Sequence, residues 1–196
     1  LDGALADHDI SVGVLFSATN WTRWWYPKES RARLVSTIRR AEEAVTARRF
    51  GYSVQTGGLK EVILRTGSLD PGTFLHPLGS VLDDSTKKIV ESAEKVILGW
   101  AADADVVLAP LGIGDHHDHQ ITARAALAAR DGGVDVAFYE DRPYVAWAGG
   151  EAPAEVVERV DARLQRRVVS GPITAGKHRK LFYPSQLDPE FQHAIA

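Results

Sequence analysis

The stretch DVVLAPLGIGDHHDHQITARAALAAR, residues 105–130, decides the fold, because it joins an apolar strand, a glycine turn and a helix. Residues 105–110 form a short, continuous apolar run, which is typical of a strand covered on both faces in a parallel sheet. Residues 119–130 form an alanine-rich helix that DGG ends. A strand that passes directly into a helix is the repeating unit of an α/β fold.

The same alternation continues on both sides of this stretch. The further predicted elements are a strand at 9–19, a helix at 30–50, a weak strand within 51–58, a helix at 84–100 and a strand at 134–140. Ser30 is the expected N-cap of the first helix, and Gly51 is its expected stop. This order predicts an α/β fold with a mostly parallel sheet and right-handed crossovers.

The remaining segments are less regular. SLDPGTFLHPLGS, residues 68–80, has proline and glycine at turn spacing and is predicted to be a long loop. In the tail, PAEVVERVDARL (153–164) is predicted to be helical. RRVVSG (166–171) fits a strand, and KHRKLFYPSQL (177–187) fits neither type clearly.

Composition excludes several classes of protein. The 196 residues are 44% hydrophobic and 25% charged, as in an average soluble globular domain. A net charge of −3 gives no basic surface for nucleic acid. The chain has no cysteine, so disulfides, thiolate zinc sites and cysteine nucleophiles are excluded. No apolar stretch approaches the ~20 residues of a membrane-spanning helix, and no secretory signal is visible, so we expect a cytoplasmic protein.

The cluster DHHDHQ, residues 115–120, follows the predicted strand at 105–110. Ligands of open parallel sheets bind beyond the carboxyl ends of the strands, and imidazole and carboxylate are good ligands for Zn²⁺. His116 and His119 are three residues apart, so both rings can face this crevice from the first turn of a helix. The alternative is a solvated turn in which Asp118 is the N-cap. Three protein ligands are needed for zinc, and this cluster supplies two at most.

A dinucleotide-binding loop is a second alternative. GIGDHH, residues 112–117, begins like the G-x-G-x-x-G fingerprint, and Asp135 follows at about the spacing of a ribose-binding acid. His117 occupies the position of the third glycine, where close packing of helix and strand leaves no room for a side chain. The match is therefore weak.

Four stretches resemble the PIG-L or LmbE-like family of zinc-dependent N-acetylglucosamine deacetylases. APLGIGDHHDHQITARAAL is similar to its strand–loop–HxDH–helix element, and RRAEEAVTARRFGY to its R-x-x-E helix, with Arg40 and Glu43 at the motif positions. GGLKEVILR is similar to its LG-x-P-D-x-x-x-R segment, with Glu61 where Asp is usual and Lys60 where Pro is usual. VDVAFYEDRPYVAW with KHRKLFYPSQ resembles its YEDxPYA and YxSQ motifs. The resemblance extends over nearly the whole chain.

The resemblance implies a Rossmann-like three-layer α/β fold, formed as a single domain over residues 1–196, and one catalytic Zn²⁺. His119 would bind the metal, and His116 would polarise the amide carbonyl or stabilise its oxyanion. Asp118 would hold an imidazole in orientation. The implied reaction is hydrolysis of an acyl group from a small-molecule N-acylated amino sugar or sugar conjugate.

One motif of the family is absent. PHxDD, which supplies the other His and Asp ligands and the general base, does not occur in the 196 residues. DHD at 7–9 is a weak substitute at the wrong end of the sheet. The chain begins at Leu1 and contains no methionine, so we expect it to lack the family's first strand. The competing interpretation is an inactive family member that serves as a carbohydrate-binding or scaffold protein.

Other side chains are candidates for substrate contact. Trp25, within NWTRWWYP, fits a wall for a sugar ring, a lid or a subunit contact, so a homo-oligomer stays open. Glu61 fits a ligand of substrate hydroxyls or an exposed loop glutamate, and Tyr144 fits a pocket residue or a packed tyrosine. The remaining histidines are predicted to be surface residues without partners at metal spacing; these are His76, His178 and His193.

Overall fold

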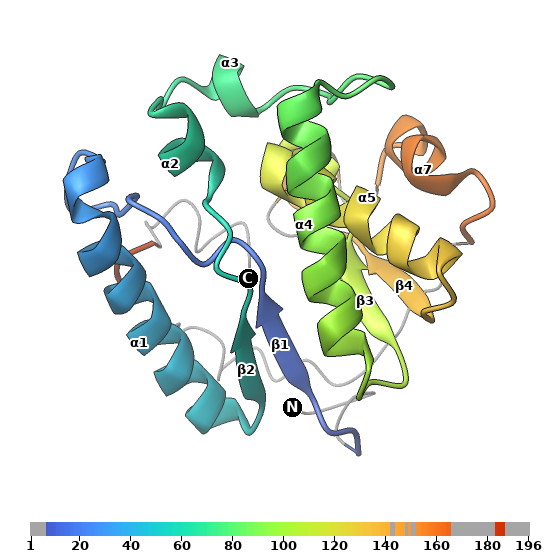
Figure 1. The fold of residues 1–196 in the computed structure, drawn as a ribbon, viewed down its shortest axis with the longest axis horizontal. Helices are drawn as coiled ribbons and strands as arrows, with labels where there is room; N and C mark the ends of the chain where they lie inside the picture. Colours follow the sequence, from blue (N-terminus) through green and yellow to red (C-terminus); the bar gives the residue numbers. More distant parts are fainter. Residues whose placement is uncertain (1–6, 142–143, 148, 150–151, 166–182, 187–196) are drawn as a thin grey trace. The chain divides into compact units, whose positions relative to one another are not determined.

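The structure is a computed structural model that describes residues 7–141, 144–147, 149, 152–165 and 183–186. The chain divides into two compact units. Of the described residues, 7–67, 165 and 183–186 belong to the first unit, and those within 68–164 belong to the second. Each contains parallel strands and helices, so the protein is a mixed α/β structure (Figure 1).

The first unit is built on two parallel strands joined by a long helix. β1 (Ser11–Val14) pairs with β2 (Ser53–Thr56), with Ser11 opposite Ser53 and Val14 opposite Thr56. Helix α1 (Ala32–Phe50) connects them and packs along β2 (Figure 1). The strand predicted at 9–19 is therefore real but shorter, because its ladder with β2 ends at Val14.

Of the two predictions for the ends of α1, the one for its C-terminal end is confirmed and the one for its N-terminal end is wrong. Gly51 ends the helix in the left-handed conformation (φ 75°), as expected, because glycine takes this conformation without a Cβ clash. The expectation of Ser30 as N-cap is wrong. A 3-10 turn at Glu29–Arg31 precedes the helix, and Arg31 occupies the cap position without a side-chain hydrogen bond. Helix α2 (Val62–Thr66), which the sequence did not predict, follows β2.

The second unit repeats the strand–helix–strand plan. β3 (Val107–Pro110) and β4 (Val136–Tyr139) are parallel. Helix α4 (Asp84–Ala101) precedes β3, and α5 (His117–Asp131) connects β3 to β4. The helix and strand predictions for these segments are confirmed, although α5 begins two residues before the predicted start at 119.

Helices α4 and α5 pack against each other (Figure 1). Ala93 of α4 and Ala125 of α5 are fully buried. The expectation that 105–110 is covered on both faces is wrong, since Leu108 is 52% exposed whereas Ala109 is 3% exposed. Alternate residues of a strand point to opposite faces, and the face of β3 that carries Leu108 is open at that residue although Pro110 is buried.

Three shorter helices complete the second unit. The loop predicted at 68–80 contains α3 (Pro71–Phe74), and the sequence did not predict α6 (Tyr144–Trp147). Helix α7 (Ala154–Asp161) confirms the helical prediction for 153–164. RRVVSG lies outside the described residues, as do His178 and His193. In the described part of the chain, no helix has the length and apolar character to cross a membrane.

Candidate functional site

The turn between β3 and α5 is held by glycines and by one buried carboxylate. Gly112 and Gly114 have φ values of 79° and 77°. Asp141, only 1% exposed, accepts hydrogen bonds at Oδ2 from the backbone N–H groups of Gly112 (2.6 Å) and Ile113 (2.8 Å). A Cβ at Gly114 would lie 2.4 Å from the ring of Tyr144. Left-handed backbone and lack of space therefore explain these glycines without a nucleotide.

The structure brings His116 and His119 together at the start of α5. His116 is the N-cap, and its Nδ1 accepts a hydrogen bond from the backbone N–H of Asp118 at 3.3 Å. The centroids of the two imidazole rings are 5.2 Å apart. The alternative in which Asp118 caps the helix is wrong, because Asp118 lies within the first turn and is 5% exposed.

A carboxylate that the sequence analysis did not single out lies beside His119. Oδ2 of Asp141 is 3.7 Å from Nδ1 of His119. Nδ1 of His119 and Oδ1 of Asp141 are both buried without a hydrogen-bond partner. Asp141 belongs to the YED motif, so the signal was present in the sequence. The 21 residues that lie between it and His119 in the sequence concealed the contact.

Aromatic side chains lie next to the two histidines. The Tyr144 ring stands edge-on to His119 at 5.4 Å and lies 6.3 Å from His116. Tyr144 also packs on the core cluster that includes Leu111 and Ile113. Phe74 is 5.7 Å from His116. Of the candidate residues, His116, Asp118, His119 and Tyr144 thus lie within one site of the second unit.

His76 is exposed, as predicted, and its ring contacts that of another histidine. Its Nε2 is 3.2 Å from Nε2 of His117, and the two rings meet edge-on with centroids 4.3 Å apart. Gln120 fixes the loop that carries His76: its amide donates to the carbonyl oxygens of His76 (3.0 Å) and Asp115 (2.8 Å) and accepts from the N–H of Leu78 (2.9 Å).

The residues present do not complete a zinc site. Within the described ranges, no group of three or more His, Asp or Glu side chains is placed to hold a metal ion. Asp7, His8 and Asp9 are exposed, so they do not replace the absent motif. His119 is therefore a candidate ligand whose partners the described part of the chain does not supply.

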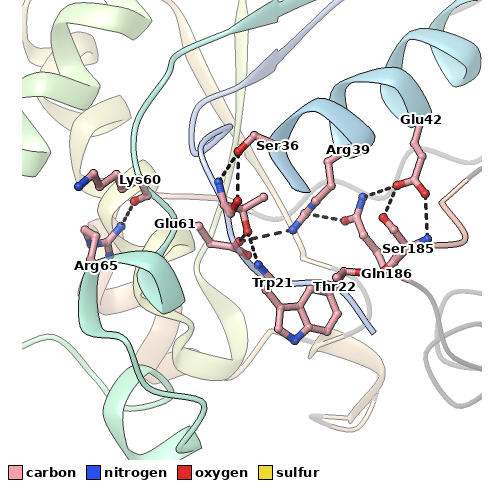
Figure 2. A network of polar contacts seen from close by, with 11 residues as sticks. Trp21, Thr22, Ser36, Arg39, Glu42, Lys60, Glu61, Arg65, Ser185 and Gln186 are labelled. Carbon is pink, nitrogen blue, oxygen red and sulfur yellow. Dashed lines mark hydrogen bonds and ion pairs between the residues drawn. The ribbon is translucent and has the colours of Figure 1, made fainter. Parts of the chain in front are cut away.

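Glu61 lies in a polar network of the first unit, shown in Figure 2. Its carboxylate accepts a hydrogen bond from the hydroxyl of Thr19 and pairs with Arg39 Nη1 at 3.4 Å. Arg39 Nη2 also donates to Gln186 Oε1 at 2.6 Å. The side chain of Glu61 is only 15% exposed, so the interpretation as an exposed loop glutamate is wrong.

The same network contains a second pair at R-x-x-E spacing, next to the Arg40 and Glu43 that were matched from sequence. Arg39 and Glu42, one residue before the positions matched from sequence, join the network. Glu42 is 9% exposed and accepts hydrogen bonds from Ser185 of the YPSQ segment. Adjacent arginines and glutamates gave the sequence no means to choose the register.

Glu43 makes different contacts. Its two carboxylate oxygens accept hydrogen bonds from the hydroxyls of Tyr52 (2.7 Å) and Tyr183 (2.8 Å). Burial, followed by the hydrogen bonds with Tyr183 and Glu43, raises the pKa of Tyr52 above its ordinary value of 10. Burial is also the main cause of the raised pKa of Tyr183.

A cavity of about 310 Å³ lies in the first unit beside this network. Its lining combines apolar strand residues with the polar side chains of α1 and the YPSQ segment. The lining residues are Val14, Phe16, Ser17, Thr19, Arg39, Arg40, Glu43, Ala44, Val54, Thr56, Tyr183 and Gln186. Trp25, also in this unit, is 40% exposed, with the guanidinium of Arg31 5.8 Å above its ring.

Comparisons with known proteins agree with these features. The 2'-N-acetylparomamine deacetylase of Streptomyces fradiae is 32% identical over 188 residues, which are 90% of this chain and 64% of that protein. The chain thus spans just under two thirds of that relative's length. The zinc-inhibited form of teicoplanin deacetylase Orf2 matches with a TM-score of 0.55 at 22% identity, over 82% of this chain and 76% of that one. No protein-family model matches.

Together, the parallel strands and the helices that connect them define a mixed α/β protein with histidines at the start of α5. The HxDH, YED and YPSQ elements resemble those of the LmbE/PIG-L deacetylase family, and both relatives point to that family.

Proposed function

We propose that the protein is an N-deacetylase that hydrolyses the acyl amide of an amino sugar or sugar conjugate. The observation that carries this proposal is the pair of imidazoles at the start of α5, 5.2 Å apart and beside the buried carboxylate of Asp141. The relative of this chain from Streptomyces fradiae is named for the removal of an N-acetyl group from paromamine. A Rossmann-like three-layer arrangement, a single domain and a cytoplasmic location stay predictions.

The proposed roles follow from position. His116 donates a hydrogen bond to the oxyanion that forms when the amide carbonyl is attacked, which is a typical way to stabilise that charge. Asp118 fixes His116 through its backbone N–H. Tyr144 packs against His119 and limits its movement.

We propose Zn²⁺ as the metal, with His119 as one ligand. Zinc bound in such enzymes lowers the pKa of a coordinated water to ~7 and so supplies a nucleophile at neutral pH. The described residues do not provide the other ligands of the metal.

A small N-acetylated sugar, of which N-acetylglucosamine is one example, is the proposed substrate. Glu61 is held by Thr19 and Arg39 at the edge of the cavity that Thr19 and Arg39 also line. Carboxylate and guanidinium groups suit the hydroxyls of a sugar, and the exposed ring of Trp25 suits its apolar face. No nucleic acid or membrane partner is proposed.

The test is zinc content and acetate release, measured on the purified protein with N-acetylated aminoglycosides and amino sugars. We expect His119→Ala to lose zinc, and His116→Ala to keep zinc and to lose about 10²–10³-fold in turnover. His8→Ala, at an exposed histidine outside the site, is the control and should change neither.

Two outcomes would contradict this proposal. If both active-site variants kept zinc, the assignment of His119 as a ligand would be wrong. If the protein bound an N-acetylated sugar but released no acetate, the carbohydrate-binding alternative would replace the enzyme. The absence of a three-ligand metal group among the described residues is the observation that favours that alternative.

A further inference from the structure

The two imidazoles at the start of α5 have different partners at Nδ1. A neutral imidazole carries one proton, and the partner of one ring nitrogen decides which nitrogen holds it. At His116 the partner of Nδ1 is a hydrogen-bond donor, and at His119 the nearest partner is an acceptor. The partner of Nδ1 therefore determines whether Nε2 of the same ring carries the proton.

At His116, the backbone N–H of Asp118 points at Nδ1 from 3.3 Å. A backbone N–H can only donate, so Nδ1 must be the unprotonated nitrogen. This contact is part of the helix cap, because His116 is the N-cap of α5. The proton of the neutral ring is therefore on Nε2.

At His119, the carboxylate of Asp141 lies beside the ring, with Oδ2 3.7 Å from Nδ1. Nδ1 of His119 and Oδ1 of Asp141 are buried, and neither has a hydrogen bond. A carboxylate can only accept. A small side-chain rotation that joins these two atoms removes the cost of two unsatisfied buried groups. The proton of the neutral ring is then on Nδ1.

Asp141 is itself fixed by the turn before α5. Its Oδ2 accepts from the N–H groups of Gly112 and Ile113, and its side chain is 1% exposed. The same carboxylate therefore ties the geometry of the turn to the orientation of His119. Positioning of an imidazole by a carboxylate is a common arrangement around catalytic and metal-binding histidines.

We propose that the fold holds His116 and His119 in opposite tautomers, and that Asp141 is the positioning residue for His119. His116 presents an N–H at Nε2, which donates to a developing oxyanion. His119 presents an unprotonated Nε2, which binds a metal ion or accepts a proton. The inference deepens the proposed function, but it concerns the rings themselves and is measured without turnover.

The experiment is a two-bond ¹H–¹⁵N correlation spectrum of the histidine rings in the ¹⁵N-labelled protein. Spectra are recorded with a chelator present, at a pH where both rings are neutral. Signals are assigned by their loss in His116→Gln and His119→Gln. In the unmodified protein we expect the coupling pattern of an Nε2–H ring for His116 and of an Nδ1–H ring for His119.

Substitution of Asp141 tests its role. In Asp141→Asn the amide oxygen can still accept hydrogen bonds from the backbone N–H groups of the turn. The negative charge that favours a proton on Nδ1 of His119 is removed. Charge-assisted hydrogen bonds are about twice as strong as neutral ones, so the tautomer ratio of His119 should move by about fivefold toward Nε2–H. The ratio of His116 should not change. Asp115→Asn, at a carboxylate in the same turn that pairs with Arg159, is the control and should leave both rings unchanged.

The results separate this inference from the proposed function. The same tautomer at both rings of the unmodified protein would overturn it, whether or not the variants fold. An unchanged His119 ratio in Asp141→Asn would remove Asp141 as the positioning residue. Opposite tautomers in a protein that releases no acetate would uphold the inference and refute the deacetylase.

Discussion

The carboxylate of Glu42 accepts two hydrogen bonds from Ser185, one from the backbone N–H at 2.8 Å and one from the hydroxyl at 2.5 Å. Ser185 is fully buried, and its carbonyl oxygen accepts from the hydroxyl of Thr22 and the N–H of Arg23. One serine therefore fastens the YPSQ segment both to α1 and to the segment that precedes Trp25. Contacts of this kind hold the polar network around Glu61 within the first unit.

Glu42→Ala should destabilise the first unit by about 2–4 kcal/mol, because it leaves the N–H and hydroxyl of Ser185 buried without acceptors. The free energy of unfolding, from urea denaturation, is the measurement. Glu91→Ala on the exposed face of α4 is the control and should cost under about 0.5 kcal/mol. Equal effects of the two variants would mean that the buried contacts to Ser185 contribute nothing net.

Gly114→Ala tests the space that Tyr144 requires. Alanine at φ 77° costs about 1–2 kcal/mol from backbone strain, and displacement of the tyrosine ring should add about 1–3 kcal/mol. Gly51→Ala is a matched control, since φ is 75° there and nothing lies within 4 Å of the added Cβ. Thermal denaturation of both variants gives the difference. If Gly114→Ala and Gly51→Ala lowered the stability equally, the position of the Tyr144 ring would not require a glycine at 114.

The tyrosines around Glu43 should ionise late in an alkaline titration. Burial and contact with the carboxylate raise the pKa of Tyr52 and Tyr183 above 10 in the folded protein. The folded state then keeps protons that the unfolded chain has lost, so the free energy of unfolding should fall as pH rises above 10.

Absorbance of tyrosinate against pH measures these midpoints. Glu43→Gln removes the negative charge and should lower the midpoints of Tyr52 and Tyr183 without returning them fully to 10, because burial persists. Midpoints unchanged by the substitution would show that burial alone causes the shift.

Gln120→Ala should release the loop that carries His76. The amide of Gln120 makes three hydrogen bonds to this loop and to the turn before α5, and their loss should lower the local opening free energy by about 2 kcal/mol. Hydrogen exchange at the N–H of Leu78 should then accelerate by roughly 30-fold. Gln55→Ala, which removes one exposed contact to Ser11, is the control. An unchanged exchange rate would show that other contacts hold the loop.

Local sequence determined the elements whose cause is local. The stop of α1 at Gly51 needs only a residue that accepts a left-handed backbone. The strands at Val107–Pro110 and Val136–Tyr139 and the helix between them follow from apolar periodicity. The placement of the histidine cluster at the junction of strand and helix was predicted for the same reason. The short helices α3 and α6 were missed because four residues show no periodicity.

Tertiary packing decided which of several similar residues makes each contact. Glu42 and Glu43 are neighbours of one type, and only the approach of Ser185 and Tyr183 gives them separate partners. Asp141 became the carboxylate beside His119 because the turn at Gly112 carries its N–H groups to the end of β4. A sequence pattern records which chemical groups are present and how far apart they lie along the chain. Burial, exclusion of water and contact between distant segments select among them, and these exist only once the chain has folded.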